Sequence, residues 1–508
     1  MSKFYLTTPI YYVNDVPHIG HAYTTIAADV LARYHRGRGD DVFFLTGTDE
    51  HGAKVAEAAA ARGKSPKEFV DEIVGHFRAA WQQLDLSYDY FIRTSDERHE
   101  HGVRTFFERW EKSGDIYKGV YEGLYCVACE RFYAEDELVN GLCPDHGTPP
   151  IQYSEENYFF RLSKYGDVLT RAIVDADDPN HYEIEPAARR NEVLGKLRLG
   201  LQDISISRAS LSWGVPLPFD PSHTAYVWID ALLNYATAVG YGDDPAQFSR
   251  YWPADLHLLA KDILWFHAII WPAMLISNGV RPPRKVYAHG FFTVNGQKMS
   301  KTRGNVIAPA QLVERYGADG ARYLLLSEFP FGTDGNVALD SMDQRFNSDL
   351  ANDLGNLLNR TVSMVNRYHQ GAVPPAGPVQ PVDEELRRAA EGLGPQVERA
   401  LDRLEFSVAL EITRATVTAA NRYVDATQPW ALARTDRNRL ATVLRTLVEA
   451  ERLIAIELMP FIPGSARRML EQLGVDPANP GERRWGAYPA DGRVVPKATP
   501  LFPKLEVA

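Results

Sequence analysis

The chain of 508 residues carries a formal net charge of −11, with 45% hydrophobic and 24% charged residues. A chain of this length should form roughly two to four domains, and its composition is that of a soluble globular enzyme. Because phosphate contacts require lysine and arginine, the negative charge argues against indiscriminate nucleic-acid binding, although it is compatible with a confined basic face.

The first fifty residues predict a βαβ unit and hence a parallel sheet. Residues 4–8 and 41–47 have the apolar pattern of buried strands, and the segment between them has helical spacing. His18 and His21, in VPHIGHAYTT, would share one face of the first helical turn, where free N–H groups attract anions. Gly20 between them would let a flat ligand lie against the backbone. Two capping or core histidines are the simpler alternative.

The three cysteines, Cys126, Cys129 and Cys143, lie close together and are followed by His146. A Cys-x2-Cys pair and a Cys-x2-His pair separated by 13 residues are typical of tetrahedral Zn²⁺ binding. Since all four ligands would come from the protein, the metal would be structural, with no position left for water. A redox CxxC or buried thiols are the alternative, and the second pair argues against them.

The cysteines belong to a segment, residues 116–225, that is rich in short polar stretches. A second α/β stretch follows at 257–275, with a strand-like segment at 285–294. An insertion within one nucleotide-binding fold is the most economical interpretation. The longest apolar run, residues 263–276, is too short to span a bilayer, and the N-terminus has no signal-peptide layout. We therefore expect a cytoplasmic protein that does not bind membranes.

The segment VNGQKMSKTRGN, residues 294–305, places Lys298 and Lys301 in a polar loop between two glycines. Two ammonium groups on a glycine-hinged loop suit closure over a polyphosphate, where they would stabilise charge that builds up in phosphoryl or nucleotidyl transfer. A solvated turn is the alternative for such a loop taken alone.

From about residue 346 the sequence becomes wholly helical. Apolar residues recur at i, i+3 and i+4 in 346–368, 404–424 and 439–458. The Pro- and Gly-rich segment 371–381 separates the first of these from the others. These patterns predict an α-helical bundle.

Two short motifs together resemble a known family. HIGH at 18–21 and KMSKT at 298–302 resemble the two signatures of class I aminoacyl-tRNA synthetases. The blocks TTPIYYVNDVPHIGHAYTT, TGTDEHG, YVWIDALLNY, AKDILWFHAIIWPAML and HGFFTVNGQKMSKT narrow the resemblance to the methionyl-tRNA synthetase family. It runs from residue 4 to about residue 470, and Thr302 stands where the family usually has serine.

The resemblance implies a Rossmann-type parallel-sheet catalytic domain, split by a zinc-containing connective insertion and followed by an α-helical anticodon-binding bundle. The expected parts are the first catalytic half at 1–115, the insertion at 116–225, the second catalytic half at 226–290, a signature-loop and stem-contact region at 291–345, and the anticodon-binding domain at 346–508. The chain lacks the C-terminal dimerising module of some relatives, so we expect a monomer.

The family reaction implies the substrates and the reacting site. L-Methionine and Mg²⁺-bound ATP would form methionyl-adenylate and pyrophosphate, and the methionyl group would pass to the 3' end of tRNA(Met), including the initiator. Catalysis would rest on placement and charge stabilisation. The resemblance implies His18, His21, Lys298 and Lys301 as catalytic residues, and an ATP site of His18, Gly20, His21, Lys298, Met299, Ser300, Lys301 and Thr302.

Matched positions also imply a methionine pocket. Its expected members are Ile10, Tyr12, Asp49, Trp228, Ala231, Tyr235, Ile263, Phe266 and His267. An aromatic-walled slot suits a polarizable thioether, and Asp49 would accept the α-ammonium group. Ordinary core packing is the alternative for each aromatic residue taken alone.

The helical third resembles the family's anticodon-binding domain. Asn352, Asn356 and Arg360, at i, i+4 and i+8, would form one polar stripe that reads base edges. Trp430 would stack an unpaired base, as is usual in recognition of loop RNA. A solvated helix face and a buried Trp430 are the alternative.

Three other functions remain open from the sequence. Leucine, isoleucine and valine synthetases carry a large editing insertion, for which this chain has no room between its α/β halves. Cysteine synthetases bind their substrate thiol through a zinc in the catalytic domain, whereas these cysteines lie in the inserted segment. A catalytically inactive tRNA-binding paralogue is the third alternative, against which the intact signature histidines and lysines argue.

Overall fold

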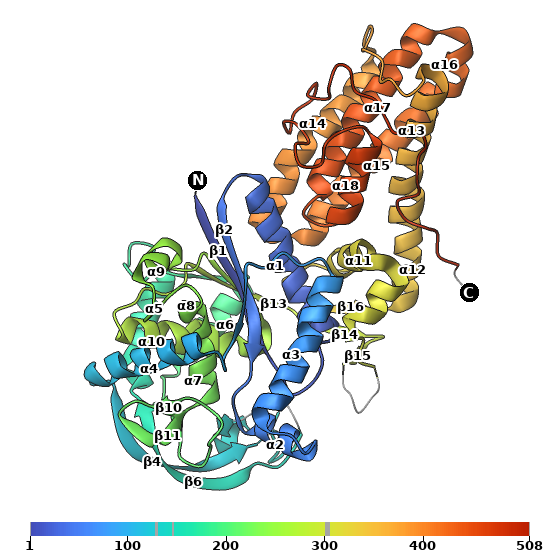
Figure 1. Ribbon diagram of the computed structural model, residues 1–508. Helices are drawn as coiled ribbons and strands as arrows, with labels where there is room; N and C mark the ends of the chain where they lie inside the picture. The colour runs from blue at the N-terminus through green and yellow to red at the C-terminus, as the bar shows by residue number, and fades with distance from the viewer. Residues whose placement is uncertain (1, 128–130, 145–146, 300–304, 507–508) are drawn as a thin grey trace. The chain divides into compact units, whose positions relative to one another are not determined.

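The computed structural model describes residues 2–127, 131–144, 147–299 and 305–506. It contains two compact units: unit 1 comprises residues 1–17, 35–82 and 86–289, and unit 2 comprises residues 18–34, 83–85 and 290–508. Most of helix α1 (Ile19–Gly37) belongs to unit 2, although the chain on either side of it belongs to unit 1. Figure 1 draws both units and labels their helices and some of their strands.

A six-stranded sheet forms the centre of unit 1 (Figure 1). Its strands in spatial order are β3 (Tyr90–Arg93), β2 (Asp41–Asp49), β1 (Lys3–Tyr12), β12 (Leu256–Ala260), β13 (Lys285–His289) and β7 (Glu183–Glu185). All neighbouring pairs run parallel, which confirms the predicted parallel sheet. The predicted strands at 4–8 and 41–47 lie in β1 and β2, which pair directly with each other.

The helices of unit 1 connect these strands. They are α2 (Ala53–Ala61), α3 (Pro66–Gln83), α4 (Glu97–Lys112), α5 (Gly166–Val174), α6 (Ala187–Arg198), α7 (Val227–Leu232), α8 (Asn234–Thr237), α9 (Pro245–Tyr251) and α10 (Trp271–Ser277). A 3-10 turn, η3 (Lys261–Ile263), and a π-helical turn, η4 (Phe266–Ile270), precede α10. The core of unit 1 is rich in aromatic side chains such as Phe106, Trp110 and Trp271, which are fully buried.

The segment 116–225 contains two antiparallel sheets. One has the order β5 (Arg131–Tyr133), β4 (Ile116–Cys126), β6 (Ile151–Phe160) and β8 (Ile204–Ser205), and the other has β10 (Pro216–Leu217), β11 (Asp220–Ala225) and β9 (Ser207–Arg208). Two 3-10 turns, η1 (Glu135–Glu137) and η2 (Leu162–Tyr165), lie beside them. The same segment also supplies β7, so it contributes an edge strand to the central sheet.

Unit 2 combines a small sheet with a helical bundle. The sheet has the order β15 (Gln297–Lys298), β14 (Phe292–Val294) and β16 (Gly335–Val337). The helices are α11 (Pro309–Ser327), α12 (Leu339–Arg345), the π-helix η6 (Phe346–Gly355), α13 (Asn356–His369), α14 (Pro381–Asp402), α15 (Phe406–Thr427), α16 (Pro429–Thr435), α17 (Arg437–Leu458) and α18 (Pro463–Gln472). The predicted helical bundle is confirmed.

Local chemistry sets the ends of the bundle helices. The carboxylate of Asp436 accepts the backbone N–H of Arg439 at 2.9 Å and caps the start of α17. Gln370, with φ of 53°, ends α13 in the left-handed region. The segment 371–381 then separates α13 from α14, as predicted. Among the described residues, no helix is long and apolar enough to cross a membrane.

Candidate active site

The start of α1 brings His18 and His21 together. Their rings stack with centroids 3.8 Å apart and planes inclined by 22°, so the predicted shared face is confirmed. The backbone N–H of Gly20 donates to Nδ1 of His18 at 3.0 Å, and the N–H of His18 donates to Nδ1 of His21 at 3.3 Å. Since each Nδ1 is an acceptor, each neutral ring carries its proton on Nε2.

Burial keeps both rings neutral. It lowers the pKa of His18 to about 4. Burial, together with the neighbouring His18, lowers the pKa of His21 well below its usual value. At neutral pH the pair therefore offers two N–H donors rather than two positive charges.

Gly20 is required by the histidine pair itself. A Cβ placed on Gly20 would lie 2.8 Å from Cε1 of His18, a contact that the ring must move to avoid. The same Cβ would lie 3.7 Å from Cε of Met299, so the beginning of the KMSKT segment lies against this turn. The N–H of Ile19 also donates to the carbonyl of Ile307 at 3.0 Å, which ties the start of α1 to the chain beyond that segment.

The structure describes only the first residues of the KMSKT segment. The backbone of Lys298 ends β15 and pairs with Thr293 of β14. Ser300, Lys301 and Thr302 lie outside the described residues. Their predicted roles stay predictions.

In unit 1, five of the residues predicted to bind methionine make direct contacts with one another. Trp228 of α7 stacks on Phe266 of η4, with ring centroids 3.9 Å apart and planes inclined by 9°. The hydroxyl of Tyr235 lies 2.8 Å from Nε2 of His267, while Nδ1 of His267 lies 2.9 Å from the carbonyl of Ile263. The carbonyl can only accept, so Nδ1 carries the ring proton and Tyr235 donates to Nε2.

The Tyr235–His267 pair is polar but uncharged. Burial lowers the pKa of His267 to about 4 and raises the pKa of Tyr235. Five of the predicted members are partly buried side chains at the edge of the core: Ile10, Tyr12, Trp228, Ile263 and Phe266. Side chains that leave the core incompletely covered are expected where a ligand completes the packing.

Asp49 lies at the carboxyl end of β2, opposite Tyr12 of β1 in the sheet register. Its side chain is buried, with 7% relative exposure for the residue. The carboxyl ends of parallel strands are where open α/β sheets bind ligands. The predicted ammonium acceptor therefore lies at the expected edge of the sheet.

Two of the four predicted zinc ligands are within the structure. Cys126 and Cys143 are buried in one small cluster with Tyr133. The backbone N–H of Gly147 donates to the Cys143 carbonyl at 2.8 Å. Cys129 and His146 lie outside the described residues. Within the described part of the chain, no group of three or more possible ligands comes together, so the zinc stays a prediction.

The predicted anticodon residues lie on the surface of the bundle. Trp430 of α16 is 47% exposed, so the interpretation of Trp430 as a core residue is wrong. Asn352 and Asn356 are exposed, and Arg360 is ion-paired with Asp425 at 3.0 Å. Helix α13, which contains Arg360, contacts α16.

A π-helix interrupts the regular α-helical spacing that was expected for residues 352, 356 and 360. Asn352 lies in η6, whose i→i+5 hydrogen bonds add residues to each turn, whereas Arg360 lies in α13. The side chain of Asn421 donates to the backbone carbonyl of Asp353 at 3.1 Å, which satisfies a carbonyl of the irregular turn. A tertiary contact thus accompanies a backbone that sequence periodicity does not predict.

Comparison with known proteins gives a consistent result over the whole chain. A family described as class I tRNA synthetases (M) matches residues 4–149 and 146–362, and the anticodon binding domain of methionyl tRNA ligase matches residues 373–494. The methionine–tRNA ligase of Caldanaerobacter subterraneus subsp. tengcongensis is 48% identical over 99% of this chain and 79% of its own length. The chain belongs to the methionyl-tRNA synthetase family.

Further proteins similar to this chain are also methionyl-tRNA synthetases by name. The methionine–tRNA ligase of Thermotoga maritima is 45% identical over 99% of this chain and 80% of its own length. The methionyl-tRNA synthetase of Mycobacterium tuberculosis in complex with methionyl-adenylate superposes with a TM-score of 0.94, at 42% identity, covering 99% of this chain and 100% of that one. Its apo form gives a TM-score of 0.85 at 39% identity, covering 100% and 99%.

The sequence interpretation missed a buried network that includes Asp230, which lies in α7 with Trp228. Nδ1 of His51 lies 2.6 Å from one carboxylate oxygen of Asp230, and Nε2 of His99 lies 2.9 Å from the other. Burial alone would raise the pKa of Asp230, but the two histidines outweigh it and lower this pKa to about 2. The network joins the loop after Asp49 to the helix of Trp228. The aspartate and one histidine occur in the motifs YVWIDALLNY and TGTDEHG, but spacing alone does not pair them.

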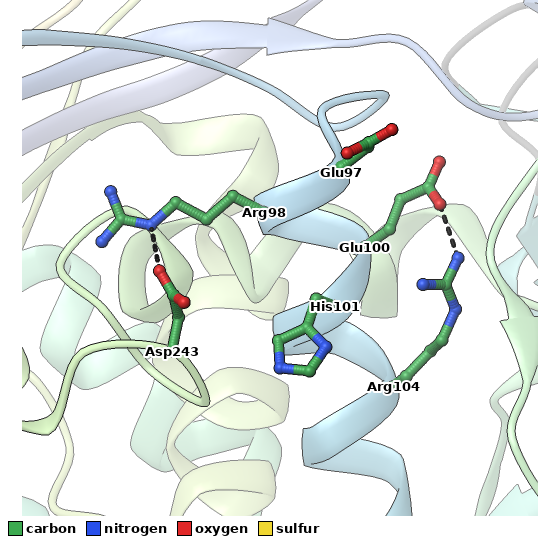
Figure 2. Close-up of a pocket in the computed structure, with 6 residues that line it drawn as sticks. All are labelled: Glu97, Arg98, Glu100, His101, Arg104 and Asp243. Atoms are coloured by element: carbon green, nitrogen blue, oxygen red, sulfur yellow. Dashed lines mark hydrogen bonds and ion pairs between the residues drawn. The ribbon is translucent and has the colours of Figure 1, made fainter.

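A cavity of about 560 Å³ lies over the first turns of α4 (Figure 2). Its lining residues are Glu97, Arg98, Glu100, His101, Arg104 and Asp243. The charges there are paired, with Arg98 at 3.2 Å from Asp243 and Arg104 at 2.6 Å from Glu100. None of the residues predicted for the synthetase site lines this cavity, so we assign it no part in the reaction.

Proposed function

We propose that the chain is a methionine–tRNA ligase that works in two steps. First, a carboxylate oxygen of L-methionine attacks the α-phosphorus of Mg²⁺-bound ATP, the bond to pyrophosphate breaks, and methionyl-adenylate forms. Second, a ribose hydroxyl at the 3' end of tRNA(Met), including the initiator, attacks the activated carbonyl carbon, and AMP leaves. The observation that carries this proposal is the stacked, neutral histidine pair at the start of α1 in a chain of this family.

The residues proposed to bind ATP belong to unit 2. We assign Nε2–H of His18 and of His21 to phosphate oxygens, because both Nδ1 atoms already accept backbone N–H groups. Neutral donors at fixed positions stabilise charge that develops in the transition state without first attracting the substrate more strongly. We assign the ammonium groups of Lys298 and Lys301 to the departing pyrophosphate. Met299, Ser300 and Thr302 would complete the loop.

The residues proposed to bind the amino acid belong to unit 1. A neutral His267, held by Ile263 and Tyr235, would contact the thioether without demanding a charge or a strong hydrogen bond from it. The Trp228–Phe266 stack would supply a flat apolar wall. Asp49 would hold the α-ammonium group, with Ile10, Tyr12 and Ala231 filling the remaining sides.

The tRNA-dependent step would use the surface of the bundle. The exposed indole of Trp430 would stack an anticodon base, and Asn352, Asn356 and Arg360 would contact base edges. Arg360 now pairs with an exposed aspartate, a weak interaction that RNA could replace.

We further assign one structural Zn²⁺ to Cys126, Cys129, Cys143 and His146. The burial of Cys126 and Cys143 in one small cluster supports this assignment. With four protein ligands the ion would hold two loops together and take no part in the reaction.

Methionine-dependent exchange of pyrophosphate into ATP tests the first step. The purified protein should catalyse exchange with L-methionine and not with leucine, isoleucine, valine or cysteine. It should also charge tRNA that carries a CAU anticodon. Exchange with another of these amino acids, or tRNA binding without any exchange, would replace this function with one of the alternatives.

Lys301→Ala tests the catalytic assignment. The exchange rate should fall by the equivalent of roughly 3–4 kcal/mol, the loss typical of one oriented donor in the transition state. The Kd of methionine should stay nearly constant, because the lysine meets pyrophosphate mainly in the transition state. Lys64→Ala, at an exposed lysine of α3's N-terminal side, is the control and should change neither quantity. A change in the methionine Kd alone would contradict the role.

A further inference from the structure

A fully buried arginine connects distant parts of unit 2. The side chains of Arg322 in α11 and Asp29 in α1 both have 0% exposure, and Nη2 of the arginine lies 2.7 Å from the carboxylate. The same guanidinium donates to the carbonyls of Phe461 at 2.7 Å, Pro460 at 2.8 Å and Leu84 at 3.2 Å. One planar group therefore holds α1, the chain at 84 and the turn between α17 and α18.

Helix α11 makes hydrogen bonds to both ends of the turn between α17 and α18. Arg322 donates to its carbonyls at 460 and 461, while the carboxylate of Asp319, one turn earlier, accepts the N–H groups of Gly464 and Ser465. The Asp319 contacts place a negative charge at the start of α18, where N–H groups lack helical partners. The turn is thus fixed by a donor and an acceptor on the same helix.

Helix α1 is held at two points by the same part of the chain. Its first residue, Ile19, donates to the carbonyl of Ile307, two residues before α11 begins. Ten residues further on, Asp29 meets Arg322. Arg33 adds a peripheral contact to Asp29 at 2.7 Å. The helix that begins with the two histidines is therefore tied to α11, and through α11 to the bundle.

We propose that Arg322 is a positioning residue that couples the anticodon-binding bundle to helix α1, so that aminoacylation depends on it far more than adenylate formation does. The inference rests on the function proposed above. Adenylate formation requires only small substrates at the reacting site. Aminoacylation requires that one tRNA engage the bundle and the adenylate together, so it requires a fixed relation between the bundle and α1.

The chemistry of the Arg322–Asp29 contact suits a positioning role better than a stabilising role. A buried ion pair is costly to desolvate, and an apolar pair of similar volume is often at least as stable. A guanidinium, however, presents five donors in one plane and so fixes several acceptors at once. The four acceptors of Arg322 come from three separate segments of the chain, which is the arrangement that a joint between elements needs.

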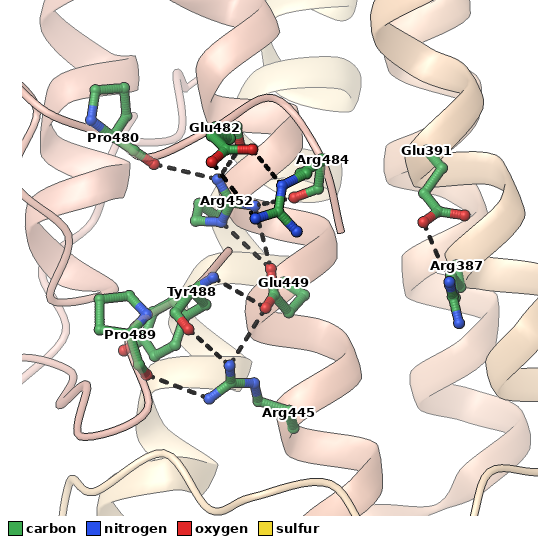
Figure 3. Close-up of polar contacts among 10 residues, drawn as sticks. All are labelled: Arg387, Glu391, Arg445, Glu449, Arg452, Pro480, Glu482, Arg484, Tyr488 and Pro489. Atoms are coloured by element: carbon green, nitrogen blue, oxygen red, sulfur yellow. Dashed lines mark hydrogen bonds and ion pairs between the residues drawn. The ribbon is translucent and has the colours of Figure 1, made fainter. Parts of the chain in front are cut away.

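The chain contains a matched control in Arg452 of α17 (Figure 3). Its side chain also has 0% exposure and also contacts one carboxylate, that of Glu449 at 3.2 Å. It donates to three backbone carbonyls, those of Pro480, Glu482 and Arg484. These contacts tie a C-terminal segment to the bundle and do not reach α1 or α11.

The experiment compares Arg322→Lys with Arg452→Lys. Lysine keeps the charge but cannot reproduce the planar set of donors. Arg322→Lys should lower kcat of aminoacylation about tenfold or more, with the tRNA KM and the methionine-dependent exchange within about twofold of the wild type. It should also reduce the difference in kcat between CAU and altered anticodons. Arg452→Lys should lower the melting temperature comparably without changing the ratio of aminoacylation to exchange.

The double variant Asp29→Leu/Arg322→Met serves if Arg322→Lys fails to fold, because it leaves neither charge buried alone. It should show the same selective loss of aminoacylation. Parallel losses in exchange and aminoacylation, an unchanged ratio, or the same change of ratio in Arg452→Lys would overturn the inference. Failure of the proposed function would be seen separately, as a wild-type protein without methionine-dependent exchange.

Discussion

At the scale of single residues, the structure explains why the signature pair consists of histidines that stay uncharged. With a pKa of about 4, His18 remains neutral throughout the physiological range, so its hydrogen bonds do not change with pH there. A lysine at either position would bind ATP more tightly in the ground state as well. Neutral N–H donors held by backbone contacts favour the transition state instead.

Gly20→Ala tests this arrangement. The new methyl group would meet the ring of His18 at 2.8 Å, so the ring must move from its stacked position. We expect the exchange rate to fall about a hundredfold, the effect of misplacing a reacting group by about 1 Å. Gly75→Ala, in the exposed face of α3 with no atom near the new methyl group, is the control. Unchanged exchange in Gly20→Ala would show that the ring position does not matter.

Glu451 of α17 gives a stability prediction that depends on pH. Burial raises the pKa of this carboxyl to about 8, and Thr361 is its hydrogen-bond partner. In the unfolded chain the group ionises near its usual pKa of about 4.3. Between these values the folded state holds one more proton than the unfolded state, so the free energy of unfolding falls as pH rises and the contribution is lost through pH 8.

Glu451→Gln should remove this dependence. Melting temperatures of the variant and the wild type should agree to within a few degrees below pH 6, and the variant should be the more stable protein at pH 9. Glu391→Gln, at an exposed glutamate of α14, should follow the wild type at every pH. Identical pH profiles for Glu451→Gln and the wild type would mean that the carboxyl is already ionised at neutral pH.

At the scale of elements, hydrophobic periodicity predicted the helices and strands whose burial pattern is set by their own local sequence. The alternation of a buried strand, a helix and a second strand gave β1, α1 and β2, because each burial pattern is complete within its own segment. The π-helical turns η4 and η6 were not predicted, since one extra residue per turn cannot be recognised in so short a pattern. In η6 the irregular turn is accompanied by a tertiary contact from Asn421, which comes from another helix.

The candidate site divides in the same way. The histidine pair was predictable from its spacing, because both residues lie within one helical turn. The residues expected to bind methionine were predicted from family resemblance, since they are spread from β1 to η4 and each has the pattern of ordinary core. The His51–Asp230–His99 network was missed, because it joins three segments that only the folded chain brings together.

The inserted segment leads to a prediction about metal. Purified protein should contain one Zn²⁺ per chain, and Cys126→Ser should lose the metal and much of the stability around β4–β6. Binding of a structural zinc contributes roughly 10–16 kcal/mol in small domains, and this energy is also folding energy. Tyr133→Phe, which alters only the hydroxyl beside Cys143 at 3.5 Å, is the control and should keep the metal. Full activity in metal-free protein would rule out the zinc.

At the scale of the whole molecule, an acidic chain has to recognise an acidic polymer. With a net charge of −11, the overall charge of the chain does not attract tRNA, so electrostatic attraction would have to come from a confined basic face. Stacking and base-edge contacts then have to supply most of the discrimination. The exposed Trp430 suits that task, because a base gains the same favourable contact whatever the overall charge of the protein.

Trp430→Ala should therefore separate the two steps of the reaction. Loss of one stacked base costs roughly 1–3 kcal/mol, so kcat/KM for charging tRNA with a CAU anticodon should fall about tenfold to a hundredfold. Methionine-dependent exchange should be unchanged, because it requires no contact with RNA. The melting temperature should also stay within a few degrees, since the indole is 47% exposed and contributes little to the core. Trp430→Phe keeps an aromatic face and should recover most of the charging rate. Equal losses in exchange and charging would remove Trp430 from the anticodon site and point instead to a general defect in folding.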